Sequence, residues 1–137
     1  YAVPKRTVGG MDSSRVALLL AVMEKRAGKK LFDQDVYINV AGGLALSDPA
    51  ADLAVCVAVA SSLSGFTLPA NLSVMGEVGL CGEVRPVSQF ERRVAECVRL
   101  GFTELVVPKQ NLKRFTPIEG VRMTGVDTLM QALAVLH

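Results

Sequence analysis

The serine hydroxyls are candidate nucleophiles in this 137-residue sequence. The single histidine is the last residue, His137, so a catalytic triad or a metal site built on histidine is close to excluded. A serine nucleophile would therefore need a lysine as its base. The interior serines equally suit helix caps and helix surfaces, which are the more common uses of this residue.

The sequence also lacks the usual phosphate-binding motifs. A P-loop needs GxxxxGK[ST] between a strand and a helix, and the only Gly-Lys pair is Gly28-Lys29, which ends a helical pattern and precedes Lys30. No G-x-G-x-x-G pattern opens a helix. We therefore expect that this chain does not bind or hydrolyse a nucleotide by itself.

Composition limits the class of protein. Half of the residues are hydrophobic and the formal net charge is +2, which excludes a disordered tail and is too mild to indicate nucleic acid by itself. No apolar run reaches the roughly 18 residues that span a bilayer, so we expect no membrane partner. Cys56, Cys81 and Cys97 are widely spaced, which argues against disulfides and zinc and predicts a cytoplasmic protein. A length of 137 residues suits one domain, residues 1–137. Because the chain begins at Tyr1 rather than at a methionine, we expect that it is part of a longer protein.

Helical and extended patterns alternate along the chain, which predicts an α/β domain of two or three layers. Expected helices cover residues 13–27, 49–63, 89–100 and 126–136, with one helical turn at 109–114. Expected strands cover an opening segment within 1–10 and residues 35–40, 44–46, 72–77, 83–85, 105–107 and 121–124. Asp48-Pro49 and Ser88 are typical helix starts. The helix at 49–63 is apolar on all sides, which places it at the centre of the domain.

Three stretches within residues 35–111 resemble the proteolytic domain of Lon proteases. SDPAADLAV begins at Ser47 where that family has DGPSAG, and GEVGLCGEVRPVSQFERR begins at Gly76 where it has GE[IV]xLxGxVxPIGGLKEK. VVPKQN begins at Val106 where the family has VIxPxxN. The resemblance implies the fold of ribosomal protein S5 domain 2, a mixed sheet with packed helices.

The same resemblance puts the family's catalytic serine at Ala50 and its catalytic lysine at Glu91. A methyl group has no nucleophilic atom, and a carboxylate cannot replace an amine that must accept the hydroxyl proton. The resemblance therefore implies a domain without proteolytic activity and without catalytic residues. A Lon-type peptidase with a rearranged dyad is the alternative.

A narrower resemblance covers nearly the whole chain. MDSSRVALLLAVMEKRAG, QDVYINVAGG, DPAADLAV and GEVGLCGEVRPVSQFERRVAE are similar to the C-terminal domain of the RadA (Sms) family, bacterial RecA-related DNA-repair ATPases. This resemblance implies an upstream zinc finger and ATPase core, which would use Zn, ATP and Mg, and no cofactor in this domain. It also implies a hexameric ring that supports branch migration of recombination intermediates on single-stranded or branched DNA.

Basic side chains are the candidates for DNA contacts, because a phosphate backbone attracts cations in a salt-dependent way. The candidates are Lys5, Arg6, Arg15, Lys29, Lys30, Arg85, Arg92 and Arg93. A ring would repeat this modest charge around a channel. A module that only oligomerises, without touching DNA, is a further alternative.

Each group of cations also has a structural interpretation. Lys29 and Lys30 suit a solvated helix end. Arg92 could pair with Glu96 at i, i+4, and Arg15 and Arg85 could form interface ion pairs.

Asp48, Asp52 and Glu91 could place carboxylates near the degenerate dyad. A metal site there is one interpretation. A capped helix start with an exposed glutamate is the more common arrangement, and we expect no metal ligand.

Overall fold

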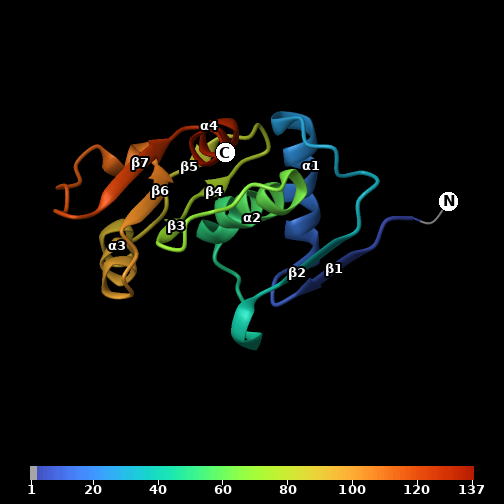
Figure 1. Ribbon diagram of the computed structural model, residues 1–137, viewed down its shortest axis with the longest axis horizontal. Coiled ribbons are helices and arrows are strands. Elements are labelled where there is room, and N and C mark those ends of the chain that lie inside the picture. Colours follow the sequence, from blue (N-terminus) through green and yellow to red (C-terminus); the bar gives the residue numbers. More distant parts are fainter. Residues whose placement is uncertain (1–2) are drawn as a thin grey trace.

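The computed structural model describes residues 3–137, and its helices and strands alternate as the sequence predicts (Figure 1). The α-helices are α1 (Ser13–Ala27), α2 (Asp52–Ser64), α3 (Phe90–Arg99) and α4 (Leu129–Leu136). The strands are β1 (Arg6–Gly9), β2 (Val36–Asn39), β3 (Leu72–Val74), β4 (Glu77–Val78), β5 (Val84–Arg85), β6 (Glu104–Pro108) and β7 (Arg122–Val126). Short 3₁₀ turns cover Ala41–Gly43 (η1), Pro49–Ala51 (η2) and Lys109–Leu112 (η3). Tyr1, within the expected opening segment, lies outside the described residues.

The strands form three small sheets within the described residues. β3, β6 and β7 make a parallel sheet in the order β3-β6-β7, with Ser73 opposite Leu105 and Leu105 opposite Met123. β1 and β2 pair in parallel, and β4 and β5 pair as an antiparallel hairpin. The expected strand at 72–77 is thus divided between two sheets.

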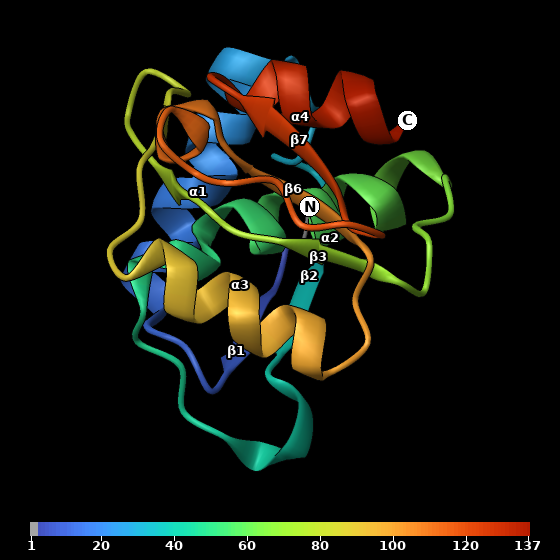
Figure 2. The same ribbon diagram turned by 90° about the vertical axis from the view of Figure 1, so that its left-hand side faces the viewer.

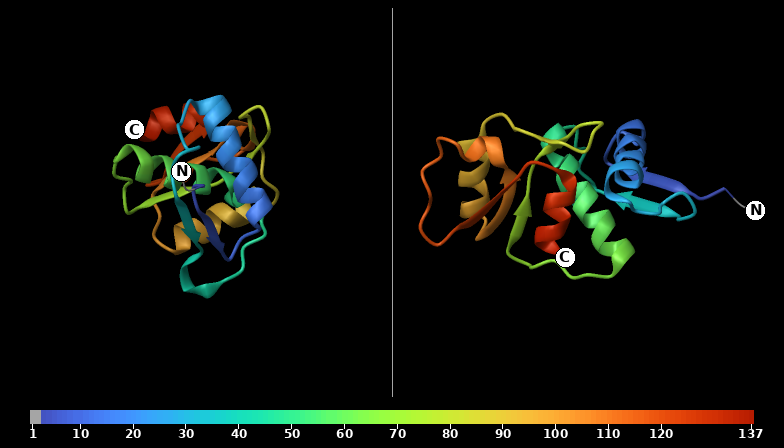
Figure 3. Two further views of the ribbon diagram at one scale, coloured as in Figure 1. Left: turned by 90° about the vertical axis from the view of Figure 1, so that its right-hand side faces the viewer. Right: turned by 90° about the horizontal axis from the view of Figure 1, so that it is seen from above.

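The three-stranded sheet is covered on both faces. Figure 2 shows α3 lying across one face, and Figure 3 shows α2 and α4 on the other, with α1 and the β1–β2 pair at the far end of the molecule. Alternate residues of β6 point to the two faces, as the pleat requires. Leu105 and Val107 join the cluster beneath α3, whereas Val106 joins the cluster around α2.

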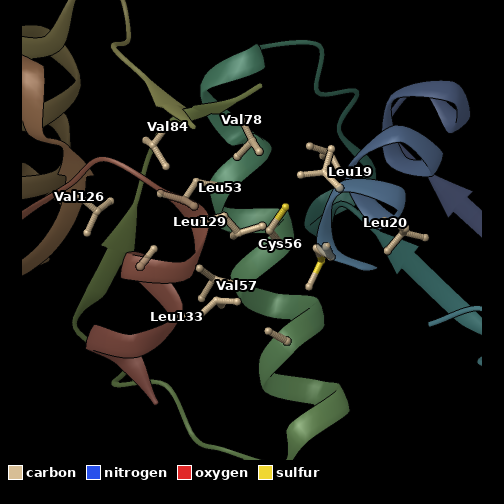
Figure 4. Packing of buried hydrophobic residues seen from close by; sticks show 14 of the residues in the cluster. Leu19, Leu20, Leu53, Cys56, Val57, Val78, Val84, Val126, Leu129 and Leu133 are labelled. Atoms are coloured by element: carbon tan, nitrogen blue, oxygen red, sulfur yellow. The ribbon is translucent and has the colours of Figure 1, made fainter. Parts of the chain in front are cut away.

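Helix α2 is central, as its apolar composition predicts. It packs against both α1 and α4, and Figure 4 shows Leu53 and Val57 of α2 in one cluster with Leu19 of α1 and Leu129 of α4. Leu53 is 0% exposed and Val57 is 1% exposed. Burial of this kind contributes about 2 kcal/mol for each large aliphatic side chain. The position of the α2 N-terminus is therefore fixed by the main core.

Local capping explains the ends of α1. The Asp12 carboxylate accepts a hydrogen bond from the Arg15 backbone N–H (3.2 Å), and Gly28 ends the helix in the left-handed conformation (φ 66°). Two local predictions are wrong. Residues 44–46 form no strand, and Ser88 does not cap α3, because left-handed Gln89 (φ 57°) occupies the cap position and makes no side-chain cap bond.

None of the helices among residues 3–137 combines the length and the apolar composition that are needed to cross a membrane.

Candidate functional site

A groove of about 760 Å³ lies between α3, strand β3 and the segment that starts α2. The segment contributes Asp48 and Ala50 to the groove. Asp48 precedes the 3₁₀ turn that Pro49 begins, and the first N–H groups of this turn need a hydrogen-bond acceptor. The Asp48 carboxylate accepts a hydrogen bond from the Ala50 backbone N–H (3.0 Å). The Ala50 side chain is thereby held against the floor of the groove, 8% exposed.

Two backbone hydrogen bonds hold the start of α2 against Gly76, which lies between β3 and β4. Gly76 donates its N–H to the Ala50 carbonyl (2.9 Å), and its own carbonyl accepts from Leu53 N–H (3.0 Å). A Cβ on Gly76 would lie 2.9 Å from Val84 Cγ1 and 3.3 Å from Leu53 Cδ2. The sheet and the turn can approach this closely because residue 76 is glycine.

Ala50 and Glu91, the two positions to which the Lon resemblance assigns the dyad, do not face each other across this groove. Ala50 lines it, but Glu91 is an exposed residue of the first turn of α3 and is absent from the lining. The α3 side chains that do line the groove are those of Arg92, Arg93, Glu96 and Cys97. No lysine or histidine belongs to the lining within residues 3–137.

Arg93 spans the groove to the start of α2. Its Nη1 lies 2.6 Å from Asp48 Oδ2 and its Nη2 lies 3.4 Å from Asp48 Oδ1, while its Nε donates to the Ser88 carbonyl (2.7 Å). Hydrogen bonds from Arg93 and from Ala50 N–H lower the pKa of the Asp48 carboxyl group. The side chains of Arg93 and Asp48 are 27% and 41% exposed, so water still reaches this ion pair.

The residues before α3 are held by a distant amide. Asn111 accepts a hydrogen bond from Val87 N–H (2.9 Å) and donates one to the Val87 carbonyl (3.1 Å). The chain then turns at Gln89, whose side-chain oxygen accepts a hydrogen bond from Arg92 Nη1 (3.0 Å). This turn sets the direction of α3 and so presents Arg92 and Arg93 at the groove.

A second arginine–aspartate pair lies on the other side of the α2 start. Asp52 is 1% exposed, and it accepts hydrogen bonds from Arg15 Nε (3.1 Å), Arg15 Nη2 and Val78 N–H (3.1 Å). The hydrogen bond to Asp52 raises the pKa of the Arg15 guanidinium. Arg15 thus stabilises the junction of α1, α2 and β4 within one chain, and the expected interface pair is intramolecular.

The structure separates the other predicted DNA-binding residues. Lys5 immediately precedes β1 and Arg6 is its first residue. The Arg6 guanidinium donates hydrogen bonds to the carbonyls of Gln34 and Leu31 (2.7 Å for the latter). Lys29 and Lys30 follow α1, and Lys29 Nζ lies 3.3 Å from Ser64 Oγ.

Two predicted ion pairs take a different form. Arg85 pairs with Glu83 (3.2 Å) in its own hairpin. Glu96 pairs with Arg99 rather than with Arg92. Of all the candidates, the structure brings together Ala50, Arg92 and Arg93.

The possible metal ligands of the described residues do not gather into one site. Within residues 3–137 no three His, Cys, Asp or Glu side chains converge on one point. Asp48 and Asp52 are each committed to an arginine. Burial raises the pKa of Cys56 to about 12, so this thiol is a core residue rather than a ligand.

Sequence reasoning did not identify Asp48 as the partner of Arg93, or Asn111 as the residue that holds the turn before α3. The two members of the ion pair are 45 residues apart, and no local pattern links them. The VVPKQN motif does contain Asn111, so its spacing marks the residue without indicating its role.

Comparison with known proteins gives a family and several relatives. The protein-family model described as "Subunit ChlI of Mg-chelatase" matches residues 11–111, which include the whole groove. Proteins named "DNA repair protein RadA" from Halalkalibacterium halodurans, Bacillus subtilis and Escherichia coli are 44%, 45% and 42% identical to this chain. The matches cover 97–98% of this chain but only 29–30% of each relative, so the chain spans about three tenths of their length.

Proposed function

The chain belongs to the family described as subunit ChlI of Mg-chelatase. From its RadA relatives and from its groove we propose that it is a non-proteolytic, Lon-like, DNA-binding part of a DNA repair protein. The RadA relatives support the role in DNA repair, since they match nearly the whole chain. The observation that carries the rest is the groove, which has a methyl group at Ala50 and two arginines along α3. The two carboxylates of its lining, Asp48 and Glu96, are each paired with an arginine. Such a groove suits an anion better than a peptide bond that must be attacked.

The groove composition argues against a rearranged Ser-Lys dyad. Ser73 and Ser88 line it, but Ser73 Oγ contacts Cys97 Sγ (3.3 Å), and the described lining offers no amine to accept a hydroxyl proton. A serine without such a base is a weak nucleophile. We therefore propose that this groove does not hydrolyse peptides.

We further propose that the chain assembles into a hexameric ring around DNA, in support of branch migration. A single chain carries a formal charge of only +2, so its attraction to a phosphate backbone is weak. Repetition around a ring multiplies that attraction without any new contact. The ATPase activity, with its ATP, Mg and Zn, would belong to other parts of the protein, because these residues hold neither a P-loop nor a metal cluster.

Binding to single-stranded DNA tests the proposal. The 137-residue chain is titrated into a fluorescein-labelled oligothymidine, and fluorescence anisotropy is followed at several salt concentrations. We expect binding that weakens as salt rises, since each phosphate contact on a single strand contributes about 0.7 to the magnitude of the slope of log K against log salt. Absence of binding at low salt, for chains shown to be assembled by sedimentation, favours a module that only oligomerises.

Activity-based labelling tests the loss of proteolysis separately. A fluorophosphonate probe reacts with an activated serine, so we expect no labelled residue and no digestion of casein. Labelling of Ser73 or Ser88 would support the rearranged peptidase.

A further inference from the structure

We propose that Asp48 competes with the DNA phosphate backbone for Arg93. The Asp48 carboxylate occupies the Arg93 guanidinium until a phosphodiester group of DNA displaces it. This inference rests on the proposed DNA binding and adds a location and a form of control to it. The juxtaposition that carries it is one ion pair placed across the groove.

The charged side chains along the groove differ in the partners that they already bind. Glu96 is bound by Arg99 through Nε (3.0 Å) and Nη2 on the same helix, so its charge is already compensated outside the groove. Arg92 is exposed and donates to the neutral amide of Gln89. Of the two arginines that line the groove, Arg93 is the one that forms an ion pair with an acidic side chain of the lining, Asp48.

The Asp48–Arg93 pair is suited to exchange. A guanidinium binds a carboxylate and a phosphate with the same two-pronged geometry, so either anion can occupy the same donors. The pair is partly exposed, so water screens it and it contributes little to stability. A phosphate that is held by Arg92 as well as by Arg93 can therefore replace the carboxylate. Asp48 therefore lowers the affinity for phosphate both by occupying Arg93 and by its own negative charge.

The substitution Asp48→Asn removes the competitor and keeps the local fold. The amide oxygen of asparagine still accepts the hydrogen bond from Ala50 N–H, so the start of α2 remains capped. We expect the variant to bind the labelled oligothymidine roughly two- to fivefold more tightly than the unmodified chain at low salt. Glu119→Gln is the matched control, because it removes the same charge from an exposed loop residue.

A double-mutant cycle separates competition from a general change of charge. If Asp48 acts through Arg93, the gain from Asp48→Asn disappears when Arg93→Gln is also present. Urea unfolding of each variant confirms that it folds before its affinity is compared.

Each outcome has a defined meaning. Tighter binding by Asp48→Asn that depends on Arg93 supports the inference. An equal gain with Arg93→Gln present, or a gain no larger than that of Glu119→Gln, overturns the inference and leaves the proposed DNA binding intact. Failure of every folded variant to bind oligothymidine overturns both.

Discussion

Single residues of this chain act through charge pairs on either side of one short turn. Asp48 and Asp52 flank η2, and each binds an arginine from a different helix. The Arg15–Asp52 pair is the more buried of the two, since Asp52 is 1% exposed whereas Asp48 is 41% exposed in its side chain. The first pair therefore contributes to stability, and the second is available to a ligand.

Replacing Arg15 by methionine leaves the Asp52 carboxylate buried without its counter-charge. We expect Arg15→Met to lower the free energy of unfolding by about 3 kcal/mol, measured by urea denaturation. The double variant Arg15→Met/Asp52→Leu should recover part of this loss, because no isolated charge remains. A loss below about 1 kcal/mol for the single variant would show that the pair behaves as a surface pair.

The lowered pKa of Asp48 predicts a dependence of stability on pH. Its folded-state pKa lies below the ordinary value of 3.8, so its contribution is complete above that value and is lost as pH falls through the folded-state pKa. We expect the free energy of unfolding of the unmodified chain to fall more steeply below pH 3.8 than that of Asp48→Asn. Parallel pH profiles for the two proteins would contradict this assignment.

Secondary-structure elements show where sequence reasoning succeeds and where it cannot. The ends of α1 are set by neighbouring residues, Asp12 and Gly28, so the sequence predicts them. The start of α3 depends on Asn111, which fixes Val87 from 24 residues away, and the expected cap at Ser88 is therefore wrong. Local patterns cannot reveal a contact of that kind.

The candidate site divides in the same way. The motif positions in the sequence identify Ala50 and Glu91, and the positive charges of Arg92 and Arg93 identify these two residues. The partner of Arg93 and the position of Glu91 outside the groove depend on how α3 packs on the sheet. The sequence therefore predicts the residues of the site better than their pairing.

Gln89 gives a test of the turn that orients α3. A non-glycine residue in the left-handed region carries a strain of about 1 kcal/mol, so we expect Gln89→Gly to stabilise the chain by up to that amount in urea denaturation. Ala95→Gly, at an exposed position within the same helix, should instead cost about 1 kcal/mol. Equal destabilisation by both substitutions would show that the turn is not strained.

At the scale of the whole molecule, the proposed self-association would have exposed apolar side chains to bury. Phe32, Tyr37 and Leu44 are 67%, 65% and 67% exposed on and around β2. Association would remove part of this surface from water.

Sedimentation velocity tests the assembly proposed for the chain. We expect a species several times heavier than the 14.6 kDa chain, with dissociation on dilution. A single 14.6 kDa species at every concentration would contradict a ring formed by these residues alone.

The most direct test of the account compares two pairs of cations in oligothymidine binding. Arg92→Gln/Arg93→Gln removes the two arginines of the groove, and Lys109→Gln/Lys113→Gln removes the same charge from η3 and the residue after it. We predict that the arginine variant loses most of the affinity and reduces the magnitude of the slope of log K against log salt by about 1.4, whereas the lysine variant changes both far less. Equal losses from the two variants would contradict DNA binding at this groove.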